Sequence, residues 1–98
     1  MSDLPDLKTY YDIRRVADTK AFAAAMTFIS WHNRLTMTPM LDVWEALVVT
    51  FAYEKRQIDP MLFSGVKSFL EQHRPSPPDS LESCRSLADD LLNFLSTK

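Results

Sequence analysis

The sequence has one glycine in 98 residues, and it contains no Asn-Gly or Asp-Gly pair. Tight β-turns usually need such residues where φ is positive, so a fold of many short strands would require more of them. The six prolines lie where helices are expected to begin or end. These features argue against a β-rich fold and favour an all-α one.

The chain also lacks cysteine pairs and long apolar runs. Its one cysteine, Cys84, cannot form an intramolecular disulfide, which favours a reducing compartment. The most hydrophobic run, ALVVTFAY at 46–53, is far shorter than the ~20 residues that a spanning helix needs. The N-terminal stretch MSDLPDLKTYYD has no apolar segment of signal-peptide length. We therefore expect a cytoplasmic protein that does not enter a membrane.

No long block of one charge is present either, since 11 basic and 13 acidic side chains alternate along the chain for a net charge of −2. Such a pattern gives no electrostatic footprint for nucleic acid or an anionic membrane. The hydrophobic content of 46% is ordinary for a globular protein. Residues 1–98 are therefore expected to form a single helical domain.

Two interpretations of residues 5–34 are open. Ser2 or Asp3 could cap a helix with Pro5 in its first turn, followed by a second helix that begins after Asp18 or Thr19. Alternatively, one bent helix runs from Pro5 to about Asn33, since asparagine tolerates the left-handed cap conformation. In both cases one broad face is apolar and includes Phe22, Ala25, Met26, Ile29 and Trp31.

A short capping residue, a proline and Met-Leu occur twice, as Thr38-Pro39-Met40-Leu41 and as Asp59-Pro60-Met61-Leu62. Each copy predicts a helix start, with proline in the first helical turn, where its missing N–H costs nothing. The predicted helices, 39–56 and 60–73, are joined by a short connection, so they form a central αα-hairpin. The first should be the most buried helix, with only Asp42, Glu45 and residues 54–56 solvated.

The C-terminal third combines a stiff connector with an amphipathic helix. RPSPPD at 74–79 is rich in proline and predicts an extended segment. Asp79 with Glu82 resembles a capping box for a helix over about 80–96. Together with the segments above, this pattern predicts a compact bundle of four or five helices.

Residues that could carry chemistry are few. His32 and His73 are 41 positions apart and begin no metal-binding motif, so we expect His32 beside Trp31 to be a partly buried aromatic neighbour. Cys84 lies on the apolar stripe of its helix, which favours a small core residue over a nucleophile. Gly65 falls inside a predicted helix and indicates a tight helix crossing. The chain is thus expected to be no enzyme and to need no cofactor or metal.

The remaining signal is the supply of bulky apolar side chains, including five methionines. Such residues suit adaptable binding surfaces. The last helix also has a two-heptad spacing suited to a dimer seam or a groove-docking helix. Candidate interface residues are therefore Leu81, Cys84, Ala88, Leu91, Leu95, Met40, Met61 and Phe63.

From this pattern we expect a small protein-binding regulator, whether adaptor, inhibitor or anti-activator, that masks the surface of another protein. A homodimer is an alternative assembly. The alternative function is a DNA-binding transcriptional regulator whose hairpin acts as a helix-turn-helix. Its second helix would present Met61, Phe63 and Ser64 with Lys67 as the one cation, which is a poor set for reading bases. An enzyme that uses His32 or Cys84 is a third possibility.

Overall fold

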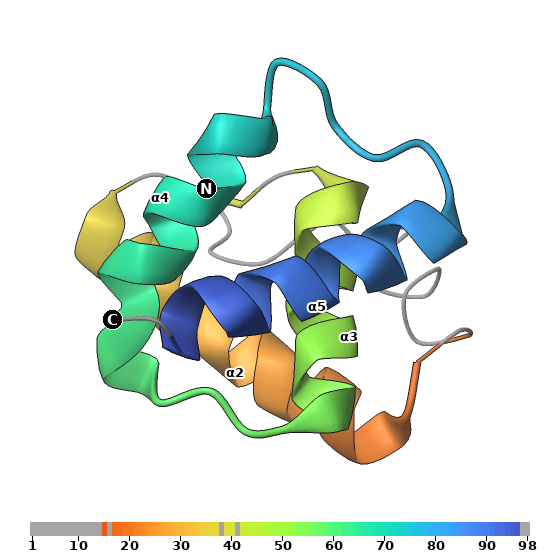
Figure 1. Ribbon diagram of the computed structural model, residues 1–98. Helices are drawn as coiled ribbons and strands as arrows, with labels where there is room; N and C mark the ends of the chain where they lie inside the picture. The colour runs from red at the N-terminus through yellow and green to blue at the C-terminus, as the bar shows by residue number, and fades with distance from the viewer. Residues whose placement is uncertain (1–14, 16, 38, 41, 97–98) are drawn as a thin grey trace.

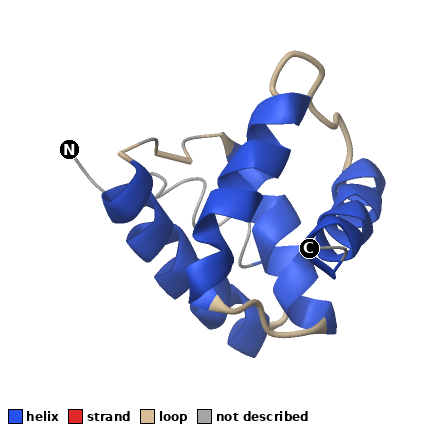
Figure 2. Ribbon diagram, turned by 60° about the vertical axis from the view of Figure 1, so that its left-hand side comes forward, coloured by secondary structure: helices blue, strands red, loops and turns tan. Residues whose placement is uncertain are grey.

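The computed structural model describes residues 15, 17–37, 39–40 and 42–96. Figure 2 shows helices and loops, and no strand, in this part of the chain. The elements are α2 (Thr19–Thr36), α3 (Val43–Lys55), the 3₁₀-helix η1 (Pro60–Leu62), α4 (Phe63–His73) and α5 (Leu81–Ser96). The prediction of an all-α fold is confirmed.

Helix α2 begins where the sequence predicts but ends later. Asp18 is extended, and its carboxylate accepts a hydrogen bond from the Ala21 N–H at 3.1 Å, so no helix runs continuously from Pro5 through Asp18. The conformation of residues 1–14 lies outside the described residues. The predicted stop at Asn33 is wrong, because α2 continues to Thr36 and ends at Met37 in the left-handed conformation (φ 56°).

Helix α3 starts at Val43, so the predicted start at Pro39 is wrong. Thr38 lies outside the described residues, and Asp42 precedes the first turn. Met40 belongs to the loop before α3 and is fully buried, with its N–H donating to Asn33 Oδ1 at 3.0 Å. The Asn33 side chain thus binds the loop that follows, while α2 continues to Thr36 and the Met37 N–H donates to the Asn33 carbonyl oxygen.

The helices pack around α3, which lies between α2 and α5 (Figure 1). Every residue of α3 from Glu45 to Ala52 is buried, as expected for the central helix. Helix α4 packs against both α5 and α2. At the α4–α5 crossing, a Cβ added to Gly65 would lie 3.0 Å from Leu95 Cδ2, which confirms the tight intramolecular contact predicted for this glycine.

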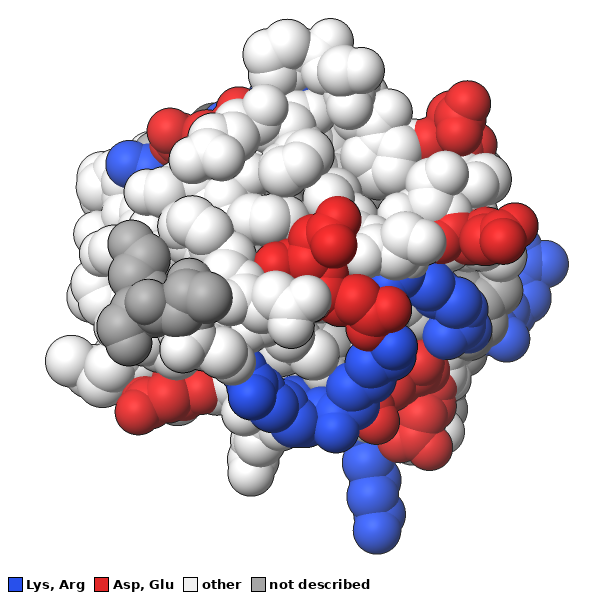
Figure 3. Space-filling model, in the orientation of Figure 1, with Lys and Arg blue, Asp and Glu red and all other residues white. Residues whose placement is uncertain are grey.

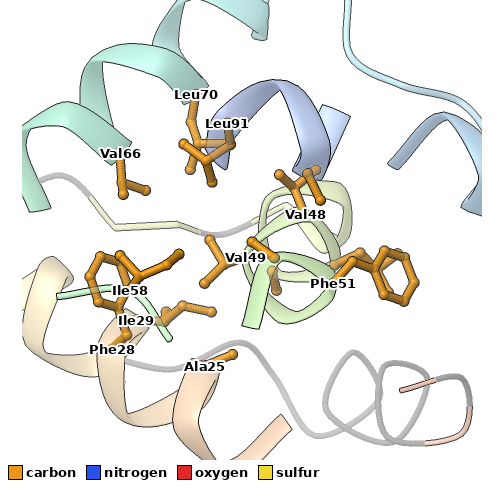
Figure 4. Packing of buried hydrophobic residues seen from close by; sticks show 14 of the residues in the cluster. Ala25, Phe28, Ile29, Val48, Val49, Phe51, Ile58, Val66, Leu70 and Leu91 are labelled. Atoms are coloured by element: carbon orange, nitrogen blue, oxygen red, sulfur yellow. The ribbon is translucent and has the colours of Figure 1, made fainter. Parts of the chain in front are cut away.

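One apolar cluster receives side chains from each of the described helices α2, α3, α4 and α5. Figure 4 shows its inner part, with Ala25 and Ile29 of α2 facing Val49 of α3, while Val66 and Leu70 approach from α4. Leu91 of α5 is also fully buried there. At ~1.5–3 kcal/mol for each large side chain removed from water, this cluster is the main stabilising feature of the fold.

The two later helix starts show how short polar side chains set element boundaries. Asp59 caps η1 as predicted, since its Oδ1 accepts from the Met61 N–H at 2.9 Å. At α5 the predicted cap Asp79 is wrong. Ser80 takes that role, because its Oγ accepts from the Ser83 N–H at 3.1 Å. The connector between α4 and α5 is mostly exposed.

Basic and acidic side chains lie side by side over the lower right of Figure 3. Two of the cross-helix ion pairs between α3 and α5 are Lys55–Asp89 and Arg85–Glu54, the latter at 3.0 Å. The Arg85 guanidinium also lies 4.0 Å from the centroid of the Phe51 ring. Exposed pairs of this kind typically contribute ~0–1 kcal/mol each, so they orient α5 on α3 more than they stabilise it.

Glu45 was expected to be solvated, and this is wrong. Its side chain is 2% exposed, and Oε2 accepts from Arg74 Nη2 at 2.9 Å and from Nε at 3.3 Å. Burial raises the pKa of the Glu45 carboxyl, and the Arg74 hydrogen bonds oppose that shift. The pair joins the start of α3 to the residue that follows α4, whereas α4 itself packs against α5 and α2.

Candidate functional site

Most residues proposed as an interface from the α5 pattern lie in the core of the chain itself. Cys84, Ala88, Leu91 and Leu95 are each 6% exposed or less, as is Met40. Their apolar side chains contact the other helices, so they are covered without a partner. Met61 and Leu81 remain exposed at 69% and 46%, and Phe63 is half-buried.

A groove of about 1080 Å³ runs along α2, and we call it the α2 groove. One wall is a face of α2, and the other is the end of α3 with residues 57–60. Its surface is mainly apolar and comprises, among others, Ala24, Thr27, Phe28, Trp31, Tyr53 and Ile58.

The α2 wall follows from helical periodicity. Ala24, Thr27, Trp31 and Arg34 follow one another at intervals of three or four residues, and Phe28 comes four residues after Ala24 and three before Trp31, so they share one face of the helix. Phe28 and Met26 are buried and form the floor, whereas Thr27 and Arg34 are exposed at the rim. The Asp18 cap fixes where this helix begins.

The second wall is a short segment held by two hydrogen bonds. The Tyr53 hydroxyl donates to the Ile58 carbonyl oxygen at 3.1 Å, which ties the segment to α3. Asp59 closes the turn through its bond to the Met61 N–H. Burial, with a smaller contribution from Asp59, raises the pKa of Tyr53 to about 12, so its hydroxyl stays protonated and keeps donating at neutral pH.

Large apolar side chains continue beyond this wall. Pro60 of the groove is followed by Met61 and Leu62 of η1, both of which are exposed. Phe63 comes next and packs edge-on against Trp31, with ring centroids 5.9 Å apart. This aromatic contact connects the α2 groove with η1, so groove and exposed turn form one apolar surface.

A smaller hollow of about 760 Å³ lies between the start of α3 and the connector. Val43, Trp44, Pro77 and Leu81 line it together with the buried Cys84. Of the residues proposed from sequence, Leu81 and Cys84 meet here. Burial raises the pKa of the Cys84 thiol, which makes it a weaker nucleophile at neutral pH.

The described residues bring together no acid–base constellation around either candidate. His32 is only 1% exposed and is therefore more deeply buried than the sequence predicts, and neither histidine lines the hollow that contains Cys84. No three His, Cys, Asp or Glu side chains in the described ranges are grouped as metal ligands. Among the same residues, each helix is too short or too polar to cross a bilayer.

The hairpin proposed for DNA binding offers little positive charge at its second helix. Lys67 pairs with Glu71 at 3.7 Å, and Arg74 pairs with Glu45. The exposed residues at its N-terminal end are Met61 and Leu62 of η1 and Ser64 of α4. Proteins that recognise DNA bases in the major groove usually have Arg, Lys, Asn or Gln at these positions.

Comparison with known proteins finds no matching family model, no matching curated protein and no matching solved structure. Similarity therefore assigns neither family nor function to the chain, and a functional proposal must rest on its surface.

The α2 groove was not predicted from the sequence, because one wall lies within residues 24–34 and the other within residues 53–60, and only the fold joins them. The sequence of α2 nevertheless contains one feature that could have indicated the groove. Phe28 and Trp31 extend the apolar side of α2 beyond what one core-facing stripe needs. Such a widened stripe indicates a helix with two apolar contacts, one inside the chain and one available to a partner.

Proposed function

We propose that this chain is a small non-enzymatic regulator, an adaptor, inhibitor or anti-activator, that binds another protein through the α2 groove. The observation that carries the proposal is the apolar surface of the groove and η1, which the described residues leave open. Monomeric proteins rarely expose contiguous apolar area of this kind without a binding role.

The dimensions of the groove favour a helix of the partner protein as its occupant. The α2 wall from Ala24 to Arg34 covers ten helical steps, or roughly 15 Å at ~1.5 Å per residue. This length matches about three turns of a docked helix. Small-molecule pockets typically measure ~300–1,000 Å³ and enclose their ligand, whereas this groove of about 1080 Å³ is open.

The chemistry of the walls defines the expected partner helix. The floor residues Phe28 and Ile58 accept bulky apolar side chains at i, i+3 or i+4, and i+7 of an amphipathic helix. The rim residues Thr27, Gln57 and Asp59 are exposed and polar. The partner is therefore an amphipathic helix with a polar outer face, and binding covers its apolar side.

Site-specific photo-crosslinking tests this proposal. A photoreactive phenylalanine analogue at Thr27 should capture a protein in the cells of origin, and the crosslinked peptide should map to an amphipathic helix. A crosslink to a second copy of the chain would instead indicate a homodimer, and one to the chain's own first residues would mean that the groove is closed from within. Either of these results would overturn the proposal.

A pair of matched variants then tests the groove with the purified partner. Thr27→Glu places a charge at the groove, and Ala23→Glu places the same charge at an exposed α2 position outside it. We expect Thr27→Glu to weaken binding at least about tenfold, since a charge must then be desolvated, and Ala23→Glu to have little effect. Equal affinities would refute the groove as the binding site. Steeply salt-dependent binding of duplex DNA would favour the alternative regulator.

A further inference from the structure

His32 is an ionisable side chain sealed inside the protein. It lies on the inner side of α2, 1% exposed, with its ring centroid 6.1 Å from that of Phe28. Its two ring nitrogens have different surroundings. Nδ1 is 3.2 Å from Asn33 Oδ1, whereas buried Nε2 has no hydrogen-bond partner among the described residues.

The hydrogen bonds around Asn33 assign the tautomer of His32. The Met40 backbone N–H points at Oδ1 of Asn33 at 3.0 Å, and an N–H requires an acceptor there, so this atom is the amide oxygen. An amide oxygen cannot donate, and therefore His32 Nδ1 must carry the proton in their shared hydrogen bond. The neutral ring then holds a bare lone pair on Nε2.

A second proton would have to bind at Nε2, which has no hydrogen-bond acceptor among the described residues. The new N–H would be buried without an acceptor from this part of the chain, and the ring would become a buried cation. Each of these changes is costly, because an unpaired polar group or charge loses its hydration on burial. The Asn33 hydrogen bond supports the charged ring only through the nitrogen that is already protonated.

The charged groups that act on His32 come from α4 and from the residue that follows it. Lys67 and Arg74 repel a positive ring, and Glu71 attracts it. Glu71 already pairs with Lys67, and Arg74 is held by Glu45 of α3. Burial is the largest cause that lowers the pKa of His32, and the two cations add to it.

Helix α4 is the element that we expect to separate most easily from the rest of the fold. It buries three residues, Val66, Phe69 and Leu70, and the preceding η1 buries none. By comparison, α2 and α3 bury eight residues each. Elements with few buried apolar contacts open at lower free energy than the core of a protein.

We propose that His32 makes the contact between α2 and α4 sensitive to acid. A proton on Nε2 drives the imidazolium towards water, and α4 separates from α2 so that the charge can be hydrated. The Trp31–Phe63 contact breaks in the same movement, because its two rings belong to these helices. This inference does not depend on the identity or existence of a partner at the α2 groove.

The direction of the pH effect follows from linkage. An unfolded histidine titrates near pH ~6.5, and His32 in the folded protein titrates below this value. The opened or unfolded form therefore binds more protons. The stability that depends on neutral His32 is fully present above pH ~6.5 and decreases as the solution is acidified through that value. Glu45 acts in the opposite direction. Its pKa is raised in the folded protein, so the stability that it contributes increases as the pH falls.

Nitrogen NMR of the imidazole rings provides the first test. At neutral pH, His32 Nε2 should give the signal of an unprotonated nitrogen and Nδ1 that of a protonated one. His32 should titrate below pH ~6.5, the value of an unfolded histidine. A protonated Nε2 at neutral pH, or titration of His32 at or above that of an unfolded histidine, would overturn the proposal.

Tryptophan fluorescence in a Trp44→Phe background reports the opening of α4, because Trp31 then remains as the single tryptophan. Below pH ~6.5 we expect a red shift of its emission and an opening constant that rises up to about tenfold per pH unit, which corresponds to ~1.4 kcal/mol. His32→Asn, which retains a donor near Nδ1, and His32→Phe, which retains the ring, should both abolish this pH dependence. His73→Asn is the matched control and should retain it.

If both His32 variants show the same acid response as the parent protein, the proposal is wrong. If neither variant folds, the NMR titration of the parent chain still decides the result, because it measures the proton on His32 directly.

Discussion

The buried ion pair between Glu45 and Arg74 gives a quantitative prediction for Arg74→Ala. This change removes two hydrogen bonds to Glu45 Oε2, of 2.9 and 3.3 Å, and leaves a carboxylate that is 2% exposed without its cation. Hydrogen bonds to charged groups contribute ~1.5–3 kcal/mol in buried settings. The Arg74 side chain is 35% exposed, so water screens part of this interaction. We therefore expect Arg74→Ala to cost about 2 kcal/mol at neutral pH.

The cost should depend on pH, since Glu45 can escape it by binding a proton. Loss of Arg74 removes the hydrogen bonds that oppose burial, so the pKa of Glu45 rises further above its usual value. The folded variant then binds a proton more tightly than its unfolded chain, and its stability increases as pH falls through that raised pKa. Near pH ~5 the difference from the parent protein should therefore shrink.

Urea denaturation of a double-mutant cycle checks this reasoning. Glu45→Gln keeps the shape and removes the charge, and in that background Arg74→Ala should cost less than about 0.5 kcal/mol. If Arg74→Ala costs the same with and without Glu45, or if its cost grows in acid, the ion pair is not the source of the effect.

Two further predictions concern a cap and the core. Asp59→Ala removes the acceptor for the Met61 N–H and should lower the free energy of unfolding by about 1 kcal/mol in urea denaturation, whereas Asp59→Asn should retain most of it. Leu91→Asp places a charge at a fully buried position of α5 and should abolish the folded state, as judged by circular dichroism. Asn93→Asp, on the exposed side of the same helix, should change stability by less than about 0.5 kcal/mol. A folded Leu91→Asp monomer would show that α5 is not held by the core.

The elements that the sequence predicts correctly are those set by neighbouring residues. Asp59 was placed as a cap, and Asp18 as one of two candidates with Thr19, because a capping acceptor and the N–H group that it binds lie within three residues of each other. The amphipathic pattern of 80–96 likewise matches α5 nearly to the residue. The error at Pro39 arose where a local start signal competed with a tertiary contact. Met40 is fully buried ahead of α3, which begins only at Val43.

The residues of functional interest depend on contacts that are distant in sequence. Glu45 looked solvated because its partner Arg74 is 29 positions away. The α2 groove needs Phe28 and Ile58 to approach each other, and no local pattern relates them. The α5 stripe was read correctly as apolar, yet a stripe gives no information on whether its contact is intramolecular. In this chain the fold itself covers Cys84, Ala88, Leu91 and Leu95.

The connector between α4 and α5 has a practical consequence for engineering. It is mostly exposed, and its main-chain ties are short-range, such as the bond from the Ser76 N–H to the His73 carbonyl oxygen at 3.2 Å. Exposed segments of this kind accept added sequence better than helices do. A fluorescent reporter or affinity tag inserted between Ser76 and Pro77 would keep both chain ends native and leave the α2 groove free for study.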